Sequence, residues 1–156
     1  RLPPAPAAVA FLGSESPFPF DTATARLPLP GTPATASACM PQLEVLGIAS
    51  RLASKAGLPG SHPGYVTDLA RGWLETRSAA ELAAITVYAC GPTPMLRAVK
   101  ELAAGFGLPS QLCVEEFMAC AVGGCAGCVM PVMIDGQRQM KRVCVDGPVF
   151  DGAAIF

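Results

Sequence analysis

The sequence predicts an α/β fold with a parallel sheet, followed by a compact module of strands and loops. Stretches typical of strands and helices alternate up to about residue 110, a pattern that indicates strand–helix–strand units. Beyond that point a cysteine- and glycine-rich segment precedes a hairpin signal. We therefore expect two domains, 1–110 and 111–156, in a chain of 156 residues, which is long enough to bury a core.

Local patterns assign the elements of the first half in chain order. Residues 7–12 form a short apolar run that ends at Gly13, which favours a buried strand. Five prolines between residues 14 and 35 indicate a long surface loop. Pro41 is suited to the first turn of a short helix, and residues 48–52 have the character of a strand.

The next elements follow from periodicity and from helix-ending residues. Apolar positions in 66–76 have the spacing of one helical face. Residues 85–90 are β-branched and aromatic, so they predict a buried strand that stops at Gly91. A helix over 95–104 should then end at Gly105.

The C-terminal part predicts a short strand and a hairpin. Residues 112–115 favour a strand. Asp135 and Gly136 suit the positive φ angles of a type I′ turn, so 129–134 and 137–143 should pair around them. The hairpin would bring the last cysteine of the chain back to the cysteine-rich loop.

Four cysteines form the most specific motif. Their spacing leaves four, two and fifteen residues between successive members, which is the plant-type spacing for a [2Fe-2S] cluster. The interspersed glycines Gly123, Gly124 and Gly127 suit a loop that needs positive φ angles and a close approach of backbone to sulfur. We call these four residues the cysteine quartet: Cys120, Cys125, Cys128 and Cys144.

Three other interpretations of the quartet stay open. A zinc site accepts the same ligands, although only Cys125 and Cys128 form a short Cys-x-x-Cys pair. Disulfides need an oxidising compartment, but the chain has seven cysteines and no signal-peptide pattern. Free cysteines can also serve as small core residues.

Composition narrows the range of partners. A formal net charge of −1 gives no electrostatic reason to expect nucleic acid or an anionic membrane surface. The apolar runs are shorter than a membrane span. Charged residues make up only 15% of the chain, which suggests either that part of its surface is covered or simply an alanine-rich composition.

A second candidate site lies where the predicted strand 85–90 meets the following helix. Ligands collect at the carboxyl ends of parallel strands, and Cys90, Gly91 and Pro92 occupy such an end. The same residues also suit an ordinary turn and helix start. No glycine-rich dinucleotide or phosphate loop occurs in the chain.

These motifs carry a family resemblance. Cys90-Gly91-Pro92 before a helix resembles the motif of the ferredoxin-NADP reductase superfamily. The segment 114–120, the quartet spacing and the ending 142–150 are similar to the electron-transfer subunits of type B dihydroorotate dehydrogenase. The match is specific from about residue 88 to 150 and looser before residue 76.

The resemblance implies a ferredoxin-reductase-like nucleotide-binding domain followed by a [2Fe-2S] module. It implies the quartet as cluster ligands, with Cys90, Gly91 and Pro92 bordering the flavin and nicotinamide. Electrons would pass from an FMN-containing catalytic subunit through the cluster and FAD to NAD⁺, in a cytoplasmic heterotetramer of pyrimidine biosynthesis.

The chain departs from the family pattern in two ways. The family's FAD-binding barrel and glycine-rich turn are not in this sequence, and Ala121 stands where the family usually has glycine. We therefore expect the C-terminal portion of a longer subunit, with an incomplete sheet and weak binding of NAD(H) by this chain alone.

Two alternative functions remain. The same architecture would suit the small subunit of an NADH-dependent ferredoxin:NADP reductase or of a hydrogenase reductase. A zinc-stabilised interaction module represents a different class, and metal analysis separates it from the electron-transfer functions.

Overall fold

The computed structural model describes residues 8–156, which form two compact units. One unit ends at Arg77 and the other begins at Ser78. No helix within the described range is both long and apolar enough to cross a bilayer. This boundary lies at a different position from the domain boundary that we expected at residue 110. The division into a nucleotide-binding domain and a cluster-binding domain stays a prediction.

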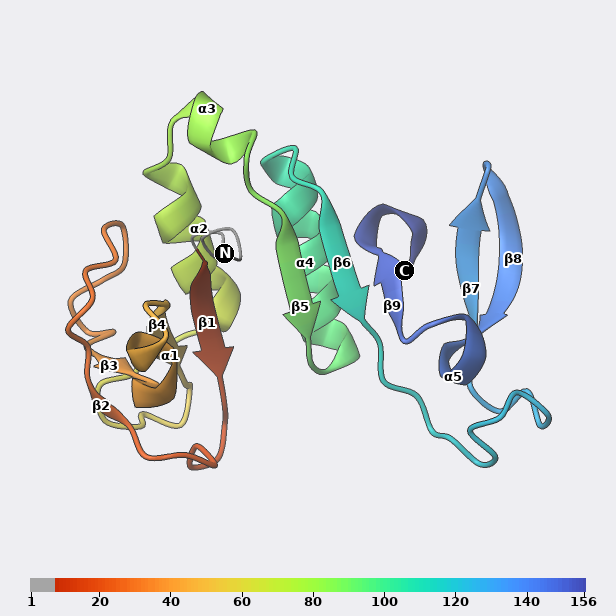
Figure 1. The fold of residues 1–156 in the computed structure, drawn as a ribbon, viewed down its shortest axis with the longest axis horizontal. Coiled ribbons are helices and arrows are strands. Elements are labelled where there is room, and N and C mark those ends of the chain that lie inside the picture. Colours follow the sequence, from red (N-terminus) through yellow and green to blue (C-terminus); the bar gives the residue numbers. More distant parts are fainter. Residues whose placement is uncertain (1–7) are drawn as a thin grey trace, which may run out of the picture. The chain divides into compact units, whose positions relative to one another are not determined.

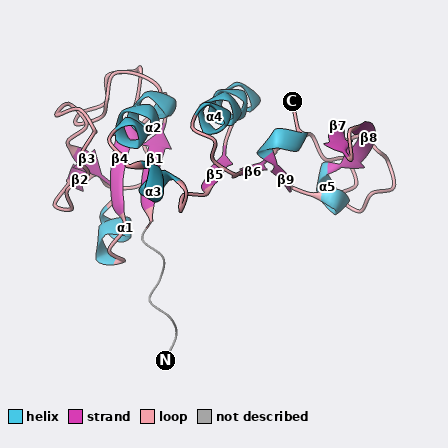
Figure 2. Cartoon of the chain, turned by 90° about the horizontal axis from the view of Figure 1, so that it is seen from above, coloured by secondary structure: helices cyan, strands magenta, loops and turns pink. Residues whose placement is uncertain are grey.

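The first unit is built on a parallel strand pair, β1 and β4, in which Val9 lies opposite Ala49. Helix α2 packs on both strands and helix α1 contacts β4, and the two helices lie on opposite sides of the pair (Figure 2). A carboxylate oxygen of Asp68 accepts a hydrogen bond from the Tyr65 amide at 2.7 Å, which satisfies a free N–H at the start of α2. The unit contains β1 (Val9–Gly13), β2 (Ala23–Thr24), β3 (Ala38–Cys39), α1 (Pro41–Val45), β4 (Ala49–Ala53) and α2 (Val66–Glu75).

The predicted strands and helices of this unit are confirmed within one or two residues, except that Ala7 lies outside the described range. The antiparallel pair β2–β3 was not predicted. Each of its strands has only two residues, too few to show an alternating pattern. The pairing of β2 with β3 joins the proline-rich segment to the rest of the unit.

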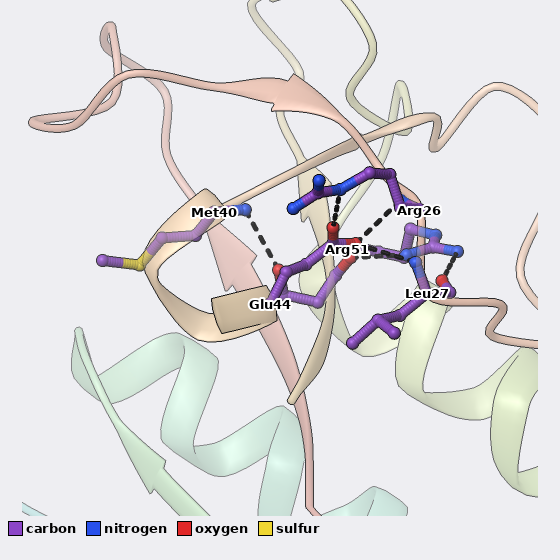
Figure 3. A network of polar contacts seen from close by, with 6 residues as sticks. Arg26, Leu27, Met40, Glu44 and Arg51 are labelled. Carbon is purple, nitrogen blue, oxygen red and sulfur yellow. Dashed lines mark hydrogen bonds and ion pairs between the residues drawn. The ribbon is translucent and has the colours of Figure 1, made fainter. Parts of the chain in front are cut away.

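A buried carboxylate organises the same segment (Figure 3). The Glu44 side chain is only 2% exposed. Its Oε1 accepts hydrogen bonds from the amides of Arg26 at 2.8 Å and Leu27 at 3.0 Å, and its Oε2 lies 3.3 Å from Nε of Arg26. The guanidinium of Arg51 donates to the carbonyl of Leu27 at 2.9 Å. These bonds lower the pKa of Glu44, first through the Leu27 amide.

The second unit contains a three-stranded sheet in the order β5–β6–β9. Strands β5 and β6 are parallel and β9 is antiparallel to β6, while α4 packs against β5 and β6 (Figure 1). The structure contains α3 (Ala79–Leu82), β5 (Val87–Cys90), α4 (Thr93–Gly105), β6 (Ser110–Cys113), β7 (Val129–Ile134), β8 (Gln137–Arg142), α5 (Val143–Asp146), β9 (Val149–Asp151) and the 3₁₀ helix η1 (Gly152–Ala154).

The prediction that residues 85–90 form a fully buried strand is wrong in one respect. Burial alternates along β5, and Tyr88 is 72% exposed. Val87 and Ala89 pack against the core that contains Leu96 of α4, so α4 covers that face of the strand. The sheet's other face carries Tyr88 and an exposed Cys90.

The hairpin prediction is confirmed. Strands β7 and β8 pair from Val129 opposite Arg142 to Ile134 opposite Gln137. Asp135 and Gly136 have φ angles of 51° and 74°, as a type I′ turn requires. The hairpin shares a hydrophobic core with the three-stranded sheet and α4. The most deeply buried residues of this core include Leu96, Leu112, Val114, Val143 and Ile155.

Candidate functional site

The cysteine quartet lies on the loop between β6 and β7 and on α5 (Figure 1). Positive φ angles occur in the loop at Ala121 (54°), Gly123 (81°) and Ala126 (55°). We expected them at the glycines, but Gly124 and Gly127 do not have them. An alanine in the left-handed region costs about 1–2 kcal/mol, so glycine would be the less strained residue at position 121.

The structure brings the quartet together as two pairs. The amide of Cys125 donates to Sγ of Cys120 at 3.4 Å. The amide of Cys144 donates to Sγ of Cys128 at 3.5 Å. Interaction with the partner thiol contributes to the lowered pKa of Cys120 and of Cys128, and the charge of Cys120 contributes to the raised pKa of Cys144. The hairpin therefore returns the fourth cysteine to the loop, as the sequence predicted.

Backbone amides favour the thiolate form at two of the four positions. Hydrogen bonds from the Val122 and Cys125 amides lower the pKa of the Cys120 thiol to about 6. The amide of Cys144 likewise lowers the pKa of Cys128. The pKa of Cys144 is raised, first because its thiol hydrogen-bonds to Cys128. Thiolates are the form that binds iron or zinc.

This donor set fits a two-iron cluster. Each iron of a [2Fe-2S] centre takes two thiolates, and the quartet supplies two close pairs. Amides directed at the sulfurs can stabilise the charge of such a centre. Among residues 8–156 no group of three or more histidine, cysteine, aspartate or glutamate side chains is arranged around one point as ligands of a single metal ion. The four cysteines remain predicted ligands.

The second candidate site is an open hollow of about 310 Å³ on the exposed face of the three-stranded sheet. Cys90 lines it together with Cys113, which lies opposite Cys90 in the parallel register. The pKa of the Cys90 thiol is raised, first by partial loss of water and then by its hydrogen bond with Cys113. The other lining residues are Tyr88, Ala89, Gln111 and Val149.

Gly91 and Pro92 lie beside this hollow in sequence but do not line it. Pro92 precedes the first turn of α4. A Cβ on Gly91 would lie 2.5 Å from Cε of Met95, so that flexible side chain would have to move, and the φ of 156° at Gly91 is one that other residues rarely adopt. Sequence reasoning had not assigned Cys113 or Glu115 to this site, although Oε1 of Glu115 lies 3.9 Å from Sγ of Cys90. Only the tertiary pairing of β5 with β6 reveals both.

Comparison with known proteins agrees with this geometry. Residues 115–156 match the family model described as the iron-sulfur cluster binding domain of dihydroorotate dehydrogenase B. The matched segment begins just after β6 and contains the whole quartet. It also includes the hairpin and β9.

Curated relatives extend the similarity towards the N-terminus. The electron transfer subunit of dihydroorotate dehydrogenase B from Caldanaerobacter subterraneus is 48% identical over 64 residues, which cover 41% of this chain and 26% of that protein. The subunit from Bacillus caldolyticus is 45% identical over 98 residues, or 62% of this chain and 34% of the relative. The chain thus spans about a third or less of these relatives.

A solved structure shows the same type of fold. It is described as the NADH-dependent reduced ferredoxin-NADP oxidoreductase and concerns flavin-based electron bifurcation. The TM-score is 0.57 at 27% identity, covering 74% of this chain and 38% of that one. The α/β architecture with parallel strand pairs is therefore of the reductase type. The chain is thus similar to the electron transfer subunit of dihydroorotate dehydrogenase B, and its residues 115–156 match the model of that enzyme's iron-sulfur cluster binding domain.

Proposed function

We propose that the chain holds a [2Fe-2S] cluster through the cysteine quartet and serves electron transfer in an NAD-dependent dihydroorotate dehydrogenase. The observation that carries this proposal is the pairing of Cys120 with Cys125 and of Cys128 with Cys144, within the segment that matches the family's cluster-binding domain. When bound, the cluster would accept and release single electrons.

The chain's own residues would hold the cluster and tune it. Amides of Cys125 and Gly127 donate to sulfurs of the loop at 3.4 Å, and they would offset the negative charge of the ligands. The core beneath the loop contains the buried Cys128 and Val143, which would limit access of water from that side. The loop thus combines polar stabilisation with an apolar base.

The remaining roles are also proposals. The region up to residue 110 would belong to a nucleotide-binding domain, and 111–156 would be the cluster domain. The hollow beside Cys90 would face flavin or nicotinamide in the whole subunit, with Gly91 and Pro92 shaping its border. The partner would be an FMN-containing catalytic subunit in a cytoplasmic heterotetramer of pyrimidine biosynthesis.

Anaerobic reconstitution tests the cluster. After incubation with iron and sulfide, the chain should show visible absorption and contain about two irons and two sulfides per chain. Cys144→Ser should lose or destabilise the cluster, whereas Cys113→Ser, which removes a thiol outside the quartet, should retain it. Stoichiometric zinc without visible absorption would refute electron transfer in favour of a structural zinc module.

The partner test separates two oxidoreductases. The similarity in fold to an NADH-dependent ferredoxin-NADP oxidoreductase favours that complex as a second candidate. The 45–48% identities to dihydroorotate dehydrogenase subunits, against 27% for the solved reductase, favour our proposal. Co-purification with an FMN-containing subunit would support it, and a large flavoprotein rich in iron-sulfur clusters would contradict it.

A further inference from the structure

Arg142 occupies the junction between the hairpin and the turn that carries the last cysteine. It ends β8 and precedes α5. Its Nη1 donates to the carbonyl oxygen of Gly123, in the middle of the cysteine loop, at 3.1 Å. Its Nε lies 3.6 Å from Oδ2 of Asp146, and its amide donates to the same oxygen at 2.7 Å. A side chain that is neither a ligand nor part of the core therefore ties the loop to α5.

The peptide unit that Arg142 holds continues towards the quartet. The carbonyl of Gly123 and the N–H of Gly124 belong to one planar trans peptide, so they point in opposite directions. The Gly124 amide is among the backbone groups that lower the pKa of the Cys120 thiol, after the amides of Val122 and Cys125. When Arg142 fixes the carbonyl end, it also fixes the direction of the N–H at the other end. The guanidinium further polarises the peptide, which strengthens the N–H as a donor.

Gly123 is fitted to this contact. A Cβ there would lie 2.7 Å from Cγ2 of Val145 and 3.3 Å from Nη1 of Arg142. Its own amide interacts with the thiol of Cys144. Both backbone groups of Gly123 thus contact residues between Arg142 and Cys144, and the absence of a side chain permits the approach.

We propose that Arg142 is a positioning residue for the cluster: it holds the Gly123–Gly124 peptide so that the Gly124 amide stays directed towards Cys120. The proposal rests on the cluster function proposed above. An N–H directed at a ligand sulfur stabilises the reduced, more negative cluster, and so raises its reduction potential. Anchoring by Asp146 keeps the planar guanidinium in one orientation, which a flexible ammonium would not retain.

Three variants of the reconstituted chain test the proposal. Arg142→Met removes the contact, and Arg142→Lys keeps the charge without the planar fork. Arg138→Met is the matched control, because Arg138 lies on the same strand and face but opposite Met133, towards the far end of the hairpin. The measurements are the midpoint potential and, after ¹⁵N-glycine labelling, the nitrogen couplings to the reduced cluster in pulsed electron paramagnetic resonance.

We expect Arg142→Met to lower the potential and to weaken a glycine nitrogen coupling, with Arg142→Lys in between and Arg138→Met unchanged. A folded Arg142→Met chain that takes up less iron than Arg138→Met would also support the proposal. Wild-type potential and couplings in Arg142→Met would overturn it. If Arg142→Lys matched wild type in both measurements, the effect would be that of charge alone, and positioning would be refuted.

A separate measurement distinguishes failure of this inference from failure of the proposed function. If the wild-type chain binds no iron and sulfide, the proposed function is refuted. Arg142 can then be judged in the cluster-free chain by amide hydrogen exchange of Gly124. Faster exchange in Arg142→Met than in Arg138→Met would support the positioning of the peptide, and equal exchange would overturn it.

Discussion

Replacement of Glu44 by glutamine should destabilise the first unit in a way that depends on pH. The substitution keeps the size of the side chain and an oxygen that can still accept from the Arg26 and Leu27 amides. It removes the negative charge and places an amide NH₂ where Oε2 meets Nε of Arg26. The Arg26 and Leu27 amides of the proline-rich segment would still donate to residue 44, but to a neutral oxygen instead of a charged carboxylate.

The magnitude follows from these two amide bonds. A hydrogen bond to a charged group contributes about 1.5–3 kcal/mol and a neutral one about 0.5–1.5 kcal/mol, so each bond should lose roughly 1 kcal/mol. The Arg26 guanidinium adds little, because its side chain is 79% exposed. The free energy of unfolding should therefore fall by about 2 kcal/mol at pH 7.

Lower pH should remove the difference. The folded state lowers the pKa of Glu44, so its stabilisation is fully present above the unfolded-state pKa. It is lost as the pH falls through the folded-state pKa, which lies below an unfolded value of about 4.3. The wild-type and Glu44→Gln stabilities should therefore converge only as the pH falls through the lowered folded-state pKa.

Urea unfolding followed by tryptophan fluorescence measures the loss of stability in the unit that contains Glu44. Trp73 is the only tryptophan and lies in the same unit as Glu44. Arg26→Met is the matched control, because it removes an exposed side chain but keeps the amide that binds Glu44; it should change stability by less than about 1 kcal/mol. A loss in Glu44→Gln that stays constant from pH 7 down through the range in which folded Glu44 becomes protonated, or no loss at pH 7, would refute the reasoning.

Two further predictions compare paired glycines. Gly60→Ala should lower the thermal stability of the chain more than Gly57→Ala. Both glycines have a φ near 70°, so both substitutions strain the backbone. The added Cβ at Gly60 would also lie 2.7 Å from Cβ of Ala38, whereas the Cβ at Gly57 would meet nothing within 4 Å. The shared backbone strain is about 1–2 kcal/mol, so equal losses would contradict a steric effect. Gly123→Ala should reduce iron uptake, since its Cβ would crowd a valine methyl of α5, while Gly124→Ala has open space and ordinary φ; equal uptake would contradict this.

Local sequence signals predicted most of the helices and strands but little of how the strands pair with one another. The turn residues Asp135 and Gly136 defined the hairpin because both carry intrinsic conformational preferences. Strand β9 was missed because its three residues follow a glycine and a proline and show no extended pattern. Its pairing with β6 is a tertiary contact, which local preference does not encode.

The candidate site shows the same division. Cysteine spacing predicted the quartet, because the ligands of such a cluster must be particular residue types at characteristic spacings in the sequence. The roles of Ala121 and Ala126 at positive φ were missed, since composition assigns that conformation to glycine. Arg142 lies two residues before Cys144 in sequence, but its contact with the Gly123 carbonyl depends on the folded loop.

The short path from α5 to β9 has a mechanical consequence. Cys144 lies in α5, and five residues later Val149 lines the hollow beside Cys90. Both sites therefore belong to one compact body that begins at Ser78. Any movement between the two units would leave the quartet and the hollow within the same unit. In the proposed function, an electron that passes between them would therefore stay within this unit.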